Sequence, residues 1–263
     1  KTTSPKMTAI ATLSIVGFFI SSLCMKKVLS ENSSKQFFYP IFIFTILIMS
    51  TYTYSLVTDY SIKSNFIIAL LLTFLILNFL LLFLMFIKPA HHLALILLPL
   101  SAIVVFLTLV FDFKDATDNI NYDLVLHIVV SLVSYGLLGL AAIQALLLKF
   151  QEQKLKDLDN SLLSNLMPSM DIMENIMFDL IVIGFVLLTI SLLTGAPFVS
   201  EETDRILLQK ITFSVIAWLV YSYLIYQRFS SNVIGKQANT LAISGMLFLF
   251  FAYLGTKVLF EFF

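Results

Sequence analysis

The sequence is dominated by apolar runs, and a helix needs roughly 20 predominantly apolar residues to cross a lipid bilayer. About eight such runs occur, near residues 7–25, 38–57, 66–87, 92–111, 122–149, 175–194, 211–226 and 240–260. Hydrophobic residues make up 59% of the chain and charged residues 12%, with a mean hydropathy of +0.98. Soluble domains carry about 25% charged residues. We therefore predict an all-α fold, a polytopic integral membrane bundle of about eight transmembrane helices.

The runs leave little chain between them. Residues 88–91 alone separate the third run from the fourth, which predicts an antiparallel helical hairpin. The fifth run is longer than a bilayer needs, so its end is expected to project into solvent. Residues 162–173 mix leucine and methionine with polar residues, which favours a short interfacial helix kinked or restarted by Pro168. Because no room is left for a separate soluble domain, residues 1–263 are predicted to form a single transmembrane domain.

Positive charges set the predicted orientation, because Lys and Arg are enriched in cytoplasmic loops. Of the 16 Lys and Arg residues, nine lie on the side of the 88–91 connection and seven on the other. The nine are Lys26, Lys27, Lys35, Lys88, Lys149, Lys154, Lys156, Arg228 and Lys236. The larger group is predicted to face the cytoplasm. Both termini are then expected on the outer side.

Composition also excludes several classes of function. The formal net charge is +0 and the lysines are scattered, whereas nucleic-acid binding needs a clustered basic face. Cys24 is the only cysteine, so the chain cannot form an internal disulfide or a thiolate zinc site. The motifs GxxxxGK[ST], GxGxxG, HExxH and GxSxG do not occur in the chain. We predict a protein that is not an enzyme, with the lipid bilayer as a partner and no nucleic acid.

Histidine is the side chain here that is most suited to binding a metal within a membrane. His127 lies near the outer end of the fifth run, and Ser131, Ser134 and Leu138 follow it along one helix face. This stripe of small residues, flanked by Tyr135, lets another helix or a flat ligand come close. Three interpretations of His127 stay open: a hydrated interfacial histidine, an axial ligand of haem iron, and a direct metal or proton-relay site.

His91 and His92 lie in the tight connection on the other side of the membrane, roughly 30 Å of hydrocarbon away from His127. They are therefore too distant to share one metal with it. We expect them to be a polar pair at the level of the lipid headgroups.

The second half of the chain, about residues 122–263, resembles a known family in four stretches. They are LHIVVSLVSYGLLGLAAIQALLL (126–148), IGFVLLTISLLTGAPF (183–198), KITFSVIAWLVYSYLIYQR (210–228) and AYLGTKVL (252–259). Their order and spacing are similar to those of the cytochrome c assembly family of haem-handling membrane proteins, that of CcsA, ResC and CcmC. The likeness is strongest to its YpjD- and HemX-like branch.

The resemblance implies haem as the cofactor, held in relatives by a tryptophan-rich external loop between two histidine-bearing helices. His127 matches the first external histidine, and Lys210 with Trp218 match the end of the tryptophan-rich region. Two departures stand out. Residues 196–209 contain no tryptophan, and Tyr226 with its two successors stands near the place of the second histidine. A bis-histidine site on the outer face is therefore not available from this chain alone.

Two functions are predicted from these features. The first is haem binding or handling in the bacterial cytoplasmic (inner) membrane, with His127 as axial ligand and Ser131, Ser134, Tyr135, Lys210 and Trp218 around it. The alternative is an accessory or scaffolding membrane protein that keeps the family's bundle without binding haem. Other membrane or cytochrome-assembly proteins are then its partners, and residues 149–174 are the expected docking segment. A transporter is disfavoured because paired intramembrane charges and broken helices are missing.

Overall fold

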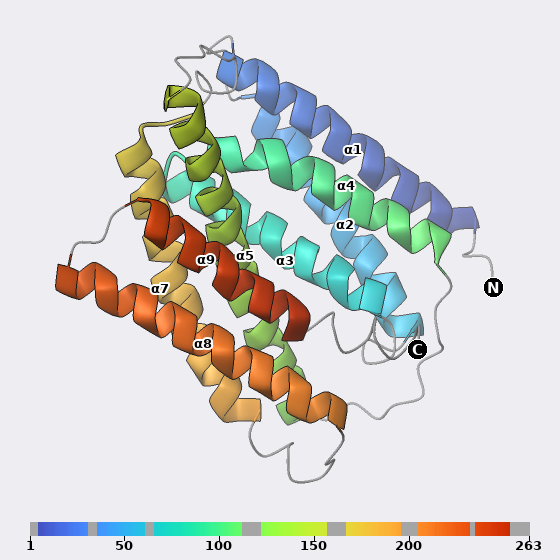
Figure 1. Cartoon of the computed structure of the whole chain (residues 1–263). Coiled ribbons are helices and arrows are strands. Elements are labelled where there is room, and N and C mark those ends of the chain that lie inside the picture. Colours follow the sequence, from blue (N-terminus) through green and yellow to red (C-terminus); the bar gives the residue numbers. More distant parts are fainter. Residues whose placement is uncertain are drawn as a thin grey trace. The chain divides into compact units, whose positions relative to one another are not determined.

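The computed structural model describes residues 5–30, 36–60, 66–111, 122–156, 167–195, 205–231 and 235–252 (Figure 1). The regular elements in these ranges are helices: α1 (Pro5–Ser30), α2 (Phe38–Asp59), α3 (Phe66–Ile87), η1 (His91–Leu93), α4 (Ala94–Val110), α5 (Tyr122–Lys156), α7 (Met170–Gly195), α8 (Arg205–Ser231) and α9 (Lys236–Phe250). Within the described part of the chain, 7 helical segments are long and apolar enough to cross a membrane. The predicted polytopic helical bundle is thus confirmed. The eighth run begins in α9, and its last residues lie outside the described ranges.

The helices lie at the predicted runs, but several are longer than predicted: α8 spans 205–231 rather than 211–226, and α1 spans 5–30 rather than 7–25. The 35 residues of α5 correspond to about 52 Å of helix, which exceeds roughly 30 Å of hydrocarbon. The projection of its end into solvent stays a prediction. α7 begins at Met170, so its first turn takes in the end of the interfacial helix predicted over 162–173. Pro168 lies just before that turn, and the N–H of Met173 donates to the carbonyl of Ser169 at 3.1 Å. Residues 170–173 therefore belong to the membrane-spanning helix α7 rather than to a separate element. Residues 162–166 lie outside the described ranges.

The helices group into two compact units, which are described separately. Unit 1 comprises residues 1–119 with 160–168, and unit 2 comprises residues 120–159 with 169–263. The single transmembrane domain expected from the sequence stays a prediction.

In unit 1, α1 packs against α2 and α4, and α3 packs against the same two helices. Gly17 lets α1 approach α2 closely, because a β-carbon there would lie 2.6 Å from Oγ1 of Thr45. Buried polar pairs also join the helices, as expected where lipid offers no hydrogen bonds. Asn78 donates to Ser101 at 2.7 Å.

The histidine pair of unit 1 is packed against protein. His91 and His92 are buried, with exposed fractions of 7% and 1%, and their place at the level of the headgroups stays a prediction. Nε2 of His91 lies 2.9 Å from the hydroxyl of Tyr39, whose ring stacks on Phe86 at 5.3 Å. The short connection after α3 folds η1 back onto α2, so these rings are covered by neighbouring helices.

In unit 2, α5 lies between α7 and α9, and α8 packs mainly against α9 (Figure 1). Contacts run in antiparallel order along α5 and α7, from His127 beside Thr194 to Gln144, which donates to the carbonyl of Met173 at 3.1 Å. α7 and α8 are likewise antiparallel, since Trp218 bonds Thr189 and Arg228 pairs with Glu174. The beginnings of α5 and α8 therefore share one end of the unit with the end of α7. We call this the outer end, following the predicted orientation.

Candidate functional site at the outer end of unit 2

His127 is the residue around which the outer end is built. Its ring is half-buried, and Nδ1 lies 3.3 Å from Oγ1 of Thr194 in the last turn of α7. The ring also packs against Gly195, where an added β-carbon would lie only 2.8 Å from Cε1. Glycine at the end of α7 thus leaves the space that the imidazole occupies. The hydrogen bond and the steric fit together fix the orientation of the ring.

The stripe below His127 is occupied by α7. The hydroxyl of Ser131 lies 2.6 Å from that of Ser191 and also donates to the carbonyl of His127 at 2.6 Å. Ser134 donates to the carbonyl of Gly184 at 2.9 Å. A β-carbon on Gly184 would lie 2.8 Å from Cδ2 of Leu138. The close approach of another helix, one of the two uses predicted for this stripe, is therefore observed.

Tyr135 of α5 reaches α8, the helix that also carries Lys210. The hydroxyl of Tyr135 forms a side-chain hydrogen bond with Ser214 of α8. Lys210, Ser214 and Trp218 follow one another at intervals of four residues, so they line one face of α8. The lower two members of this face meet α5 and α7, which directs the face inward. Lys210 is its outermost described member and is half-buried.

Trp218 joins α8 to α7 rather than lining an open surface. Its indole Nε1 donates to Oγ1 of Thr189 at 2.9 Å, and its ring stacks on Phe185 with centroids 5.5 Å apart. The indole is thereby held by α7 well below the outer end. Eight residues of α8, about 12 Å of helix, separate it from Lys210.

His127 and Lys210 lie beyond the Tyr135–Ser214 contact, at the same end of the unit. Along the helix axes His127 stands about 12 Å above Tyr135, and Lys210 about 6 Å above Ser214. The structure thus places an imidazole and an ammonium at the same end of unit 2.

Sequence reasoning missed Thr194 and Gly195, the two residues that hold the ring of His127. In the sequence Gly195 has the character of a helix terminator, and its part in packing emerges only when α7 is placed beside α5. Among the described residues, no group of three or more His, Cys, Asp or Glu side chains is arranged to hold a metal ion.

Arg228 lies at the opposite end of α8, as predicted, and it has a partner there. Its guanidinium pairs with Glu174 at 3.5 Å and lies over the ring of Phe178, 4.4 Å from the centroid. Glu174 is 8% exposed, so α7 carries a buried carboxylate that sequence reasoning did not single out. Arg228 is therefore a link between α7 and α8, distant from His127.

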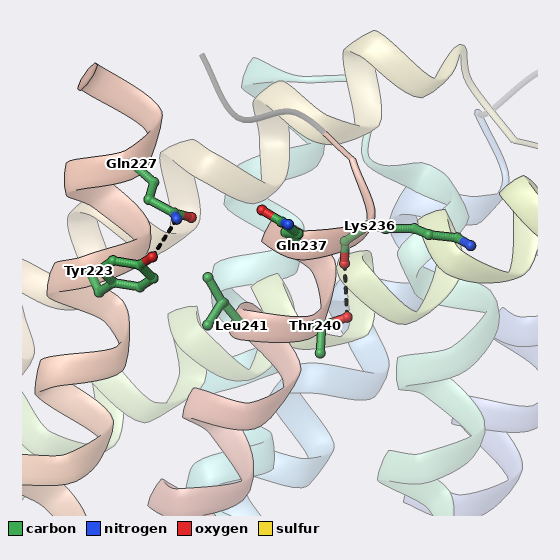
Figure 2. Close-up of a pocket in the computed structure, with 6 residues that line it drawn as sticks. All are labelled: Tyr223, Gln227, Lys236, Gln237, Thr240 and Leu241. Atoms are coloured by element: carbon green, nitrogen blue, oxygen red, sulfur yellow. Dashed lines mark hydrogen bonds between the residues drawn. The ribbon is translucent and has the colours of Figure 1, made fainter. Parts of the chain in front are cut away.

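A shallow groove of about 410 Å³ opens between the end of α8 and the start of α9 (Figure 2). Gln227 points across it from α8 and donates to the hydroxyl of Tyr223 at 2.6 Å. Gln237 faces it from α9, while the side chain of Lys236 extends away. The groove lies at the end of the unit opposite to His127 and holds none of the predicted site residues.

Comparison with known proteins places this arrangement in a family. The family described as "Cytochrome C assembly protein" matches residues 37–263. The chain belongs to this family. The match begins just before α2 and therefore includes the described helices of both units from α2 onward. The predicted membership is confirmed, and it reaches further towards the N-terminus than the motifs of the second half alone.

Individual relatives are distant. The "Inner membrane protein YpjD" of Escherichia coli (strain K12) is 31% identical over 135 residues, which cover 51% of this chain and 51% of the relative. The "Cytochrome c biogenesis protein CcsA" of Prochlorococcus marinus (strain MIT 9301) is 31% identical over 157 residues, covering 52% of this chain and 51% of that protein. The chain thus spans about half the length of the curated relatives it matches. No solved structure matches.

Proposed function

We propose that the protein handles haem during cytochrome c assembly in a bacterial inner membrane, with His127 as an axial ligand of the haem iron. Membership of the family supports the assembly role, and a relative described as an inner membrane protein supports the location. The role is one of binding and transfer rather than enzymatic turnover. The termini on the outer side and cytochrome-assembly proteins as partners belong to the same proposal.

The proposal depends on one observation, the way in which the end of α7 holds the ring of His127. A histidine that binds a metal commonly has its second ring nitrogen hydrogen-bonded, which fixes tautomer and orientation. Here Thr194 contacts Nδ1, and Gly195 leaves room for the ring. Nε2 is the atom proposed to coordinate iron. Haem iron, when bound, supplies the coordination position for that nitrogen.

The donor set fits haem only in part. Unit 2 contains no histidine besides His127, and the loop sequence 196–209 has no tryptophan to stack on a porphyrin. The second axial position is therefore proposed to be filled by a partner protein or by solvent. This incomplete set is suited to transient holding of haem rather than to permanent storage.

The test uses the purified full chain and replacement of the imidazole. Wild-type protein from haem-replete membranes is expected to show a Soret band, and His127→Gly is expected to lose it. Adding free imidazole to His127→Gly should restore the band, because the ligand then returns without the side chain. Rescue distinguishes loss of a ligand from loss of folding. A wild type without a Soret band, or a His127→Gly variant that keeps it, would contradict the proposal.

One observation favours the accessory role instead. The face formed by Ser131, Ser134 and Leu138 is filled by α7, so this part of the helix already has a structural use. A scaffold would need such packing and no pigment. Colourless wild-type protein that co-purifies with a cytochrome-assembly protein would support this alternative.

A further inference from the structure

The groove between α8 and α9 lies where a membrane-spanning segment ends. The apolar segment Leu208–Ser230 belongs to α8, and Tyr223 and Gln227, which line the groove, lie near its end. On the other side of the groove α9 begins at Lys236. The ends of transmembrane helices meet the lipid headgroups. The groove is therefore expected at headgroup depth, where a ligand can enter from the bilayer as well as from water.

Two carboxamides face each other across this groove. Gln227 on α8 and Gln237 on α9 turn their side-chain oxygens toward one another (Figure 2). The amide nitrogen of Gln227 is engaged, because it donates to the hydroxyl of Tyr223 at 2.6 Å. Its oxygen Oε1 is covered by protein and has no hydrogen-bond partner among the described residues. An acceptor in this state is unfavourable until a donor meets it.

The other residues of the groove define the donor. A primary ammonium carries N–H groups on several sides, so it can donate to two facing amide oxygens at once. The ring of Tyr223 also lines the groove, and aromatic rings attract cations. The terminal torsion of glutamine is soft, so a small turn presents Oε1 of Gln227 to such a ligand. An anion would be repelled by the two oxygens, and a quaternary ammonium has no N–H to offer.

Beyond the two amides the groove becomes apolar. Leu241, one turn further along α9 than Gln237, lines it. Deeper in the membrane-spanning segments, Leu219 of α8 is 55% exposed and Leu247 of α9 is 51% exposed. An acyl chain that starts at the groove can follow these side chains into the bilayer, which favours burial of its apolar surface. A soluble amine would leave this part of the surface unused.

We propose that the groove binds a phospholipid whose headgroup ends in a primary ammonium, as in phosphatidylethanolamine. The ammonium lies between the amide oxygens of Gln227 and Gln237, and one acyl chain runs along Leu241. The bound lipid links α8 to α9 at the end of unit 2 opposite to His127. This inference goes beyond the proposed handling of haem and does not depend on it.

The test compares two lipids that differ only in the headgroup nitrogen. Phosphatidylethanolamine and phosphatidylcholine with the same acyl chains are titrated into the detergent-solubilised full chain, and bound lipid is counted by native mass spectrometry. Hydrogen bonds to a charged group correspond to at least about a tenfold difference in affinity, so the wild type should prefer phosphatidylethanolamine by that factor. Gln227→Leu should lose this preference while its binding of phosphatidylcholine stays unchanged. Gln237 is exposed, so Gln237→Leu tests the same contact without disturbing the packed interior.

Lys236→Gln is the matched control, because Lys236 lines the same groove but its side chain extends away from it. It should keep the preference of the wild type. A preference that is lost in Lys236→Gln and kept in Gln227→Leu and Gln237→Leu would show general attraction to phosphate and overturn the inference. Equal binding of the two lipids by the wild type would overturn it as well. Displacement of the lipid by an equal concentration of phosphoethanolamine, which has no acyl chains, would identify a site for a soluble amine instead.

Discussion

Replacing Gly195 with alanine should displace the imidazole of His127, and the structure sets the size of the effect. A β-carbon at Gly195 would lie 2.8 Å from Cε1, whereas ordinary van der Waals contact begins near 3.4 Å. The ring or the end of α7 must therefore move by about 0.6 Å. The contact between Nδ1 and Thr194 is already 3.3 Å long, so this movement should break it. Overpacking of this kind costs about 1–3 kcal/mol.

Histidine side-chain NMR measures this displacement directly, without any bound ligand. The protein is labelled with ¹⁵N-histidine in detergent micelles, and His127 is assigned through His127→Gln. Gly195→Ala should shift the ring nitrogens of His127 and leave those of His91 and His92, in unit 1, unchanged. Thr194→Val is the matched comparison, because it removes the hydrogen bond without crowding the ring. Unchanged His127 resonances and unchanged unfolding in Gly195→Ala would refute the reasoning.

Three further predictions concern how unit 2 is held together. Gly184→Ala should lower the free energy of unfolding, measured with denaturant in detergent, by about 1–3 kcal/mol. Gly139→Ala should have little effect, because its β-carbon would make an ordinary 3.7 Å contact. Equal effects of the two variants would contradict the close packing of α5 on α7. Arg228→Gln should lower the free energy of unfolding more than the double variant that also carries Glu174→Gln, because the single change leaves a buried carboxylate unpaired. If the losses from the two single changes add up in the double variant, the pair is not coupled. Ser131→Ala should cost about 0.6 kcal/mol, a typical interhelical hydrogen bond in a membrane, and no measurable loss would mean that this contact contributes only through its shape.

The helices were predictable because the lipid environment imposes a length and a composition on them. The bounds of α3 coincide with the predicted run, and α5 is longer than a bilayer needs, as expected. Partners across the bundle were not predictable, because they depend on how helices are rotated about their axes. His91 and His92 are predicted only as a polar pair at the level of the headgroups, and their burial depends on how η1 packs against its neighbours. Gly195 looks like a helix terminator in the sequence. Its second role, leaving space for the imidazole of His127, is seen only when α5 is placed beside α7.

In the candidate site too, the sequence predicts which residues share a helix face, and the packing of the helices decides what that face contacts. His127, Ser131 and Ser134 are predicted from one helix face, and all three do face another element. The sequence leaves open a helix or a ligand, because small residues favour close approach without specifying what approaches. The match between Ser131 and Ser191, and between Ser134 and the carbonyl at Gly184, depends on the sequence register of α7.

The contact between α5 and α7 also limits where a ligand can lie. The Ser131–Ser191 hydrogen bond closes the space between the two helices one turn below His127. A flat molecule therefore cannot slide down this face without breaking that contact. It must approach His127 from the outer end or from the side of α8, where Lys210 stands half-buried. If haem binds, Ser131→Ala should then leave the affinity nearly unchanged, whereas His127→Gly abolishes it. A large loss of affinity in Ser131→Ala, with folding intact, would instead place the ligand between α5 and α7.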